Sequence, residues 1–256
     1  MIKEETRFKD SCVFEGMTSI RALLENLKQG KENARRIDEI LFDESKVSSK
    51  SKELNYLKKM GEIFGFNVTI TDDKSIDNYT TGASHGGIIA LCQARTYKSL
   101  SPNLITENGF YVMLEGIEDP YNFGYALRSI YASGVDGIIL SKRNWLSAAG
   151  VVCRSSAGAS ELVDVFIADD NFVECFKERG YKIVCADIKN SVSVYEANLK
   201  KPIFLIVGGE KRGISSKVLS QADQIVRIDY GRDFSSALSA ASASTILAFE
   251  VYKNNK

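Results

Sequence analysis

Apolar residues recur at two different spacings along the first hundred residues. Residues 17–27 and 48–64 carry apolar side chains at helical spacing, with Ser19 as a candidate N-cap of the first helix and Gly65 as a candidate C-cap of the second. Shorter apolar runs rich in β-branched or small residues, which are typical of strands, occupy residues 37–42, 66–71 and 87–92. The pattern predicts a small α/β unit.

A second, more apolar alternation begins near residue 110. Runs typical of buried strands occupy residues 110–114, 137–140, 163–167, 182–186, 203–207 and 224–228. Helices are expected between them, and a last one over about 236–252. Continuous apolar strands separated by helices predict a parallel sheet that is covered on both faces.

Residues 96–108 interrupt this alternation with a run of Ser, Pro and Asn that is typical of a linker. We therefore expect an N-terminal domain over residues 1–98, a linker over 99–108 and a second α/β domain over 109–256.

Composition narrows the class of protein. Lys plus Arg and Asp plus Glu both number 33, so the net charge is zero, which argues against nucleic-acid binding by bulk attraction but leaves a local basic face possible. The opening residues show no signal peptide, and no apolar run approaches the ~20 residues that span a bilayer. Five scattered cysteines and a single histidine, His85, predict neither a metal site nor a disulfide framework, which favours a cytoplasmic protein.

Two segments place polar residues after buried strands. In residues 114–128 a polar turn follows a strand, and Asn122 is a candidate cap for a helix that would contain Arg128. In residues 204–215 a strand runs into Gly208, Gly209 and a charged trio that begins with Glu210. Ligands of open α/β sheets bind at such strand ends. The alternative is a capped turn with a solvated arginine.

Familiar nucleotide loops do not fit the glycine-rich segment. Gly208 and Gly213 have the spacing of a P-loop, but Ile214 stands where its lysine belongs, and the dinucleotide pattern G-x-G-x-x-G is absent. A third segment, residues 224–250, leads from a strand into a helix that begins with small residues. Eight of the nine residues from Ser236 to Ser244 are Ala or Ser, which suits close packing against another segment or subunit.

Together these segments resemble the SpoU/TrmH-like RNA 2′-O-ribose methyltransferases over residues 110–252. That family carries, in this order, Asp-Pro-x-Asn-x-Gly-x4-Arg, then Gly-x-Glu-x-x-Gly, then Ser-Leu-Asn at a helix start. The first two motifs are matched by Asp119, Pro120, Asn122, Gly124, Arg128, Gly208, Glu210 and Gly213, and residues 155–159 look like the family's Ser-x-Gly-Ala stretch. The N-terminal half is similar to the substrate-binding domain of the branch that acts on ribosomal RNA.

The resemblance implies a parallel sheet knotted into a trefoil, S-adenosylmethionine as cofactor, RNA as substrate, no metal and a homodimer. It implies catalytic roles for Arg128, Asn122 and Glu210. The family comparison offers Arg128 for removal of the hydroxyl proton, but arginine is effectively always protonated, so we expect it instead to hold an adjacent RNA phosphate and to stabilise the developing alkoxide. The asparagine would orient the arginine or the ribose, and the glutamate would order the cofactor loop. The residues that it implies for cofactor binding are Ala186, Asp187, Val207, Gly208, Gly209, Glu210, Ile228, Leu238 and Ser239.

One motif departs from the family. Ala237 and Ser239 stand where the serine and asparagine of Ser-Leu-Asn belong. The main alternative is therefore an RNA-binding or ribosome-associated protein that has kept this fold and lost methyl transfer; a dehydrogenase or phosphotransferase is the second. Basic residues that could contact RNA, each also consistent with a solvated helix face, are Lys28, Lys31, Arg35, Arg36, Lys50, Lys52, Lys58, Lys59, Lys142 and Arg143.

Overall fold

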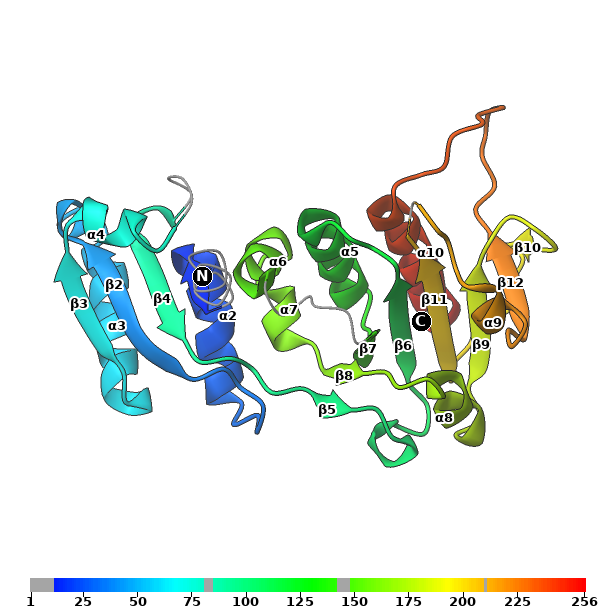
Figure 1. Cartoon of the computed structure of the whole chain (residues 1–256), viewed down its shortest axis with the longest axis horizontal. Coiled ribbons are helices and arrows are strands. Elements are labelled where there is room, and N and C mark those ends of the chain that lie inside the picture. The colour runs from blue at the N-terminus through cyan, green and yellow to red at the C-terminus, as the bar shows by residue number, and fades with distance from the viewer. Residues whose placement is uncertain (1–11, 81–84, 142–147, 210) are drawn as a thin grey trace, which may run out of the picture. The chain divides into compact units, whose positions relative to one another are not determined.

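The computed structural model describes residues 12–80, 85–141, 148–209 and 211–256. It divides into two compact units (Figure 1). The first comprises the residues up to Thr96 together with the helices α6 (Ala149–Ser155) and α7 (Ala159–Leu162). The second begins at Tyr97 and contains the rest of the described chain.

The first unit is built on a four-stranded sheet with the order β1 (Val13–Glu15), β4 (Ile88–Cys92), β2 (Ile37–Asp43) and β3 (Asn67–Thr71). Strand β4 is antiparallel to both neighbours, whereas β2 and β3 are parallel. The remaining elements of this unit are α2 (Gly16–Lys28), η1 (Glu44–Lys46), α3 (Ser51–Phe64) and α4 (Asp73–Asp77).

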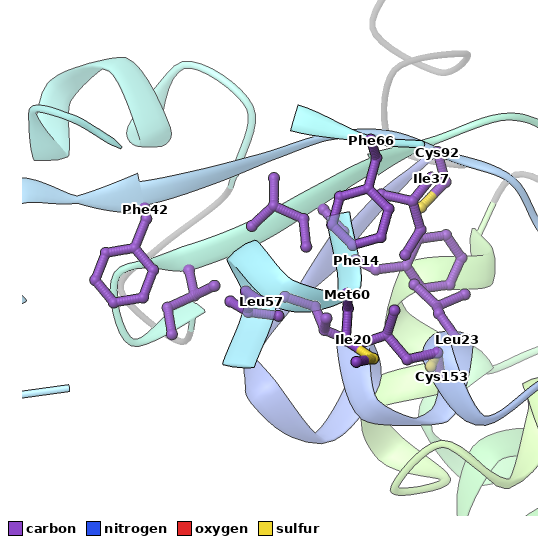
Figure 2. Close-up of a cluster of buried hydrophobic side chains, with 14 of the residues drawn as sticks. Phe14, Ile20, Leu23, Ile37, Phe42, Leu57, Met60, Phe66, Cys92 and Cys153 are labelled. Atoms are coloured by element: carbon purple, nitrogen blue, oxygen red, sulfur yellow. The ribbon is translucent and has the colours of Figure 1, made fainter. Parts of the chain in front are cut away.

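Apolar residues of the sheet and of helices α2 and α3 form the core of the first unit (Figure 2). Gly65 ends α3 in the left-handed conformation, with φ of 78°, which confirms its predicted role as a C-cap. The predicted N-cap Ser19 is wrong, because α2 begins at Gly16 and Ser19 is fully buried within it. Cys153 of α6 joins the same core, so this unit takes an element from beyond residue 98.

The second unit is an eight-stranded, fully parallel sheet. Its order is β10 (Val192–Ser193), β12 (Gln224–Arg227), β9 (Lys182–Ala186), β11 (Ile203–Gly208), β6 (Phe110–Glu115), β7 (Gly137–Leu140), β8 (Val165–Ile167) and β5 (Lys98–Ser99). Its helices are α5 (Pro120–Ala132), α8 (Phe172–Glu178), α9 (Ser216–Leu219) and α10 (Ala240–Asn254), with the 3-10 turn η3 (Pro102–Leu104). The predicted parallel sheet is confirmed.

Alternate residues of each central strand face opposite layers. Phe204 and Ile206 of β11 pack with Phe176 of α8 and Val218 of α9, whereas Val207 faces α10, which packs against α5. The strand order reverses between β6 and β11: β7 and β8 follow on one side of this pair, β9 and β12 on the other. Ligands of open α/β sheets bind at such a reversal, beyond the carboxyl ends of the strands.

Candidate functional site

The loop after β6 brings Asn122 to the carboxyl edge of the sheet. Gly116 turns the chain with φ of 78°, and α5 then begins at Pro120, whose fixed φ suits the first helical turn. The Oδ2 atom of Asp119 accepts a hydrogen bond of 2.9 Å from the backbone N–H of Asn122. Asp119 is therefore the N-cap, and the prediction that Asn122 caps this helix is wrong.

The glycine-rich loop after β11 packs directly on this turn. The N–H of Gly209 donates to the carbonyl oxygen of Glu115 at 2.6 Å, and the N–H of Gly213 donates to the carbonyl of Gly209 at 3.0 Å. A Cβ on Gly208 would lie 2.5 Å from the carbonyl carbon of Gly213. Position 208 therefore accepts only glycine as long as the loop keeps this conformation. Glu210, between these residues, lies outside the described residues.

A cavity of about 400 Å³ opens beside the glycine-rich loop, on the face of the sheet that α10 covers. Of the nine residues expected at a cofactor site, it is lined by Ala186, Asp187, Val207, Gly208, Ile228 and Leu238. The residues come from the ends of β9, β11 and β12 and from the segment before α10, which explains why positions so far apart in sequence meet here. Gly209 and Ser239 flank the cavity without lining it.

Several lining residues were not anticipated from the sequence, among them Asp229, Tyr230 and Phe234. Hydrogen bonds from the Ser193 hydroxyl and the Arg227 guanidinium hold the pKa of Asp229 below its usual value, so its carboxylate stays charged. The Oη atom of Tyr230 accepts a hydrogen bond of 3.0 Å from the N–H of Leu238, which joins the two ends of the segment that borders the cavity. In the sequence, an arginine and an aspartate two residues apart at the end of a predicted strand were the available signal for these residues. In the structure, Arg227 and Asp229 form an ion pair at 2.8 Å.

A second, smaller cavity of about 110 Å³ lies between the loop after β6, the glycine-rich loop and the start of α10. Asn122, Glu118 and Asp119 from the loop after β6, Lys211 from the glycine-rich loop and Ala240 from the start of α10 line it. Arg128 is exposed on α5 and does not line either cavity. The structure therefore brings Asn122 to the predicted cofactor residues and places Arg128 six residues further along the same helix.

Two family descriptions match the chain. Residues 109–249 match the SpoU rRNA Methylase family, and residues 15–98 match the family described as RNA 2′-O ribose methyltransferase substrate binding. The chain belongs to the SpoU rRNA methylase family. The resemblance seen in the sequence is thereby confirmed.

Relatives and solved structures agree with this assignment. The chain is 28% identical to the 23S rRNA (guanosine-2′-O-)-methyltransferase RlmB of Shewanella oneidensis, over 97% of this chain and 99% of that protein. It has the fold of the AdoMet-bound rRNA methyltransferase of Sinorhizobium meliloti, with a TM-score of 0.76 and 21% identity over 94% of this chain and 87% of that one. For AviRb of Streptomyces viridochromogenes, also solved with AdoMet, the TM-score is 0.75 at 19% identity, over 94% and 89% of the chains.

The two residues that depart from the Ser-Leu-Asn motif, Ala237 and Ser239, have different places in the structure. Ser239, at the family's asparagine position, is the N-cap of α10: its Oγ accepts a hydrogen bond of 3.1 Å from the N–H of Ser242. Asparagine caps helices as well as serine does, so this role survives the exchange. Ala237, at the family's serine position, lines the larger cavity with a methyl group.

The sequence predicted Arg35 as a possible RNA contact, and the structure shows that this prediction is wrong. Arg35 is only 3% exposed, and its Nε and Nη2 atoms each lie 3.3 Å from the carboxylate of Glu161 on α7. Arg95 reaches the same carboxylate at 3.9 Å. A buried arginine that is paired in this way cannot meet an RNA phosphate. Lys142 and Arg143 lie outside the described residues.

The single histidine lies in the one group of possible metal ligands found among the described residues, with Asp73 and Asp77. Its Nδ1 accepts a hydrogen bond of 3.0 Å from the N–H of Gly87, and its Nε2 lies 3.5 Å from Asp77 Oδ1. In the neutral ring the proton therefore sits on Nε2 and points at the carboxylate. This geometry favours a hydrogen-bonded histidine over a metal ligand.

Proposed function

We propose that this chain transfers a methyl group from S-adenosylmethionine to the 2′-hydroxyl of a ribose in ribosomal RNA. The observation that carries the proposal is that the glycine-rich loop and the start of α10 contribute to two cavities, one lined by the expected cofactor residues and the other by Asn122. Membership of the SpoU family supports it, as does the similarity to RlmB over nearly the whole chain.

The larger cavity fits a cofactor of this size and chemistry. Its volume of about 400 Å³ lies in the range of small-molecule sites, and its walls are mainly apolar with a few carboxylates, which suits an adenosyl group with a cationic sulfonium nearby. Ala186, Val207, Ile228 and Leu238 would enclose the cofactor, and the glycine-rich loop would approach it through backbone N–H groups. When bound, S-adenosylmethionine would supply an electrophilic methyl group; its transfer to the ribose oxygen would release S-adenosylhomocysteine, and the hydroxyl proton would pass to solvent.

The smaller cavity would receive the ribose, with Asn122 orienting the sugar. Arg128 lies about 9 Å further along α5, at a rise of 1.5 Å per residue, and the described residues offer its guanidinium no ion pair. Because arginine stays protonated, its role is to bind an RNA phosphate and stabilise the developing negative charge on the ribose oxygen, not to remove a proton. Glu210 would order the glycine-rich loop.

The test compares Arg128→Lys with Arg179→Lys, an exposed arginine at the end of α8. Methyl transfer from labelled S-adenosylmethionine to 23S ribosomal RNA should fall on the order of 100-fold in Arg128→Lys, the usual effect of losing one preorganised donor. Cofactor affinity measured by calorimetry should not change. Full activity in Arg128→Lys would overturn the role of this arginine, and absence of cofactor binding by the wild type would overturn the proposed reaction.

The domain boundaries follow from the same proposal. Residues 1–98 would hold the RNA, residues 99–108 would link, and residues 109–256 would carry out the transfer, except that α6 and α7 of the last segment pack in the first unit. The two family matches end and begin near these positions. The order of the central strands, with β11 between β6 and β9, is compatible with the trefoil knot expected of the transfer domain.

A homodimer is part of the proposal. Helices α5 and α10 pack against each other and expose five large aromatic residues, an unusual surface for a monomer. These residues, each 40–52% exposed, are Tyr121, Tyr125, Tyr131, Phe249 and Tyr252. We place the dimer in the cytoplasm, which agrees with five free cysteines. Among the described residues, no helix has the length and apolar character required to cross a bilayer.

A protein that binds ribosomal RNA without methylating it is the second candidate, favoured by one observation. The methyl group of Ala237 lines the larger cavity where the family places a hydroxyl. Such a protein would retain salt-dependent RNA binding and fail to bind S-adenosylmethionine near millimolar concentration, a result that calorimetry separates from micromolar binding, about −8 kcal/mol.

A further inference from the structure

Three contacts hold the glycine-rich loop against the end of β6 and the loop that follows it. Two involve Glu115: its carbonyl accepts from Gly209 N–H at 2.6 Å, and its Oε2 accepts from Ser215 N–H at 3.3 Å. These two fix the backbone at both ends of the loop. The third joins only side chains, Lys211 Nζ to Glu118 Oε2 at 3.0 Å.

The third contact differs from the others in exposure and in place. The side chains of Lys211 and Glu118 are 77% and 48% exposed, and exposed ion pairs contribute little to stability. Both residues line the small cavity with Asn122. The lysine can therefore leave Glu118 while the backbone of the loop stays where Glu115 holds it.

The charges around the small cavity make Lys211 a candidate partner for an RNA phosphate. Glu118 and Asp119 are acidic, and Lys211 is the one cation among the residues that line it. A ribose in this cavity would bring a phosphodiester with it, and a compact ammonium group is a suitable partner for phosphate. While Lys211 is paired with Glu118, that partner is occupied.

We propose that Lys211 exchanges Glu118 for a phosphate next to the target ribose, and that Glu118 acts as a built-in competitor of the RNA. This inference rests on the proposed action on RNA. It assigns Lys211 as a substrate-positioning residue and Glu118 as the group that competes with the RNA phosphate for this lysine. Both roles are additional to those proposed for Asn122 and Arg128.

The test measures filter binding of radiolabelled 23S ribosomal RNA over a range of salt concentrations. Lys211→Gln should weaken binding and lower the slope of log K against log salt by about one unit, because one phosphate contact is lost. Glu118→Gln should strengthen binding several-fold by releasing the lysine. In the double variant Lys211→Gln, Glu118→Gln that gain should largely disappear, because there is no lysine to release.

The matched control is Lys253→Gln, which removes another exposed lysine, paired with Glu250 at 3.1 Å in the last turn of α10. It should leave the slope unchanged, and Lys211→Gln should keep the wild-type affinity for S-adenosylmethionine. Equal slopes in Lys211→Gln and Lys253→Gln, or a full gain from Glu118→Gln in the double variant, would overturn the inference alone. No salt-dependent binding by the wild type would overturn the proposed function, and this inference with it.

Discussion

Gly209 lies against the backbone of Gly116 with no room for a side chain. A Cβ added to Gly209 would be 2.3 Å from the carbonyl oxygen of Gly116 and 2.5 Å from its carbonyl carbon. Real Cβ atoms do not approach backbone atoms so closely, so one of the two loops would have to move. The loop that holds Gly116 lines the smaller cavity, and the glycine-rich loop lines both.

Gly209→Ala should therefore disable the site. We expect S-adenosylmethionine affinity to fall at least 10-fold, because the displaced glycine-rich loop no longer borders the larger cavity as it does now; 10-fold corresponds to about 1.4 kcal/mol. Gly231→Ala is the control, since a Cβ there meets nothing within 4 Å. Calorimetric titration of both variants checks the prediction, which is wrong if they bind equally well.

The buried carboxylate of Glu161 should be essential for stability. It is 2% exposed and lies between Arg35 and Arg95, which are 3% and 6% exposed. Removing one partner of a buried ionic group costs about 3–5 kcal/mol, because the remaining charges lose their compensation. Glu161→Gln should lower the free energy of unfolding in urea by this order.

The control for Glu161 is Glu25→Gln, which removes an exposed ion pair with Lys28 at 3.9 Å. Exposed pairs contribute about 0–1 kcal/mol. Similar urea midpoints for Glu161→Gln and Glu25→Gln would show that the buried network does not stabilise the first unit.

Local sequence patterns predicted most of the helices and strands. They failed where contacts between distant segments determine how a residue is placed. The apolar runs predicted β6, β7, β8, β9, β11 and β12 because burial on both faces makes such runs continuous, whereas the two-residue strand β10 was not predicted. The cap of α5 was misassigned, since Asp119 and Asn122 are both good caps and only the start at Pro120 decides between them. The place of Cys153 in the first core, and of Arg35 beside Glu161, depends on residues more than 100 positions away.

The resemblance to the SpoU family predicted six of the residues that line the larger cavity, which come mainly from the ends of strands. Asp229 and Tyr230 were missed, since their place depends on a segment that returns to the cavity before α10. Arg128 occupies a motif position but lines neither of the two cavities, which only the structure shows.

Two buried thiols should resist alkylation. Burial raises the pKa of Cys153 to about 12 and that of Cys185 to about 12, the latter with a contribution from the Glu115 carboxylate. Only the thiolate reacts, so at pH 8.5 both should react with iodoacetamide far more slowly than the partly exposed Cys12. In guanidinium chloride all five should react alike, as mass spectrometry can show.

The same shifts set the sign of a pH effect on stability. The unfolded chain loses these protons near the ordinary thiol value of 9.0, whereas the folded chain keeps them to about pH 12. The stabilisation is complete below pH 9 and is lost progressively as the pH rises from 9 toward 12. Cys153→Ala, compared with wild type in urea at pH 8 and pH 10, should show a smaller loss of stability at pH 10. An equal loss at both values would contradict the shift.

Charge on the aromatic surface of α5 and α10 should separate the proposed dimer. Tyr125 and Tyr252 are 52% and 47% exposed. A lysine at either position would bring a charge into the interface, and desolvating an unpaired charge opposes association. Sedimentation velocity should show monomers for Tyr125→Lys and Tyr252→Lys, and dimers for wild type and for Tyr79→Lys, whose tyrosine lies in the first unit. Unchanged sedimentation of all three variants would place the interface elsewhere.

Restoring the family's residues before α10 should separate the structural role of this segment from its catalytic role. Ser239→Ala removes the N-cap of α10 and should lower the free energy of unfolding by about 1 kcal/mol. Ser239→Asn keeps a capping side chain, so stability should stay within a few tenths of a kcal/mol. Ala237→Ser places a hydroxyl at the wall of the larger cavity, where one hydrogen bond to a bound cofactor would increase affinity by roughly 5- to 10-fold, or about 1 kcal/mol. If the double variant Ala237→Ser, Ser239→Asn gains neither cofactor affinity nor methyl transfer over wild type, the family's Ser-Leu-Asn groups have no equivalent role in this chain, and its own segment from Tyr230 to Leu238 serves the cavity in their place.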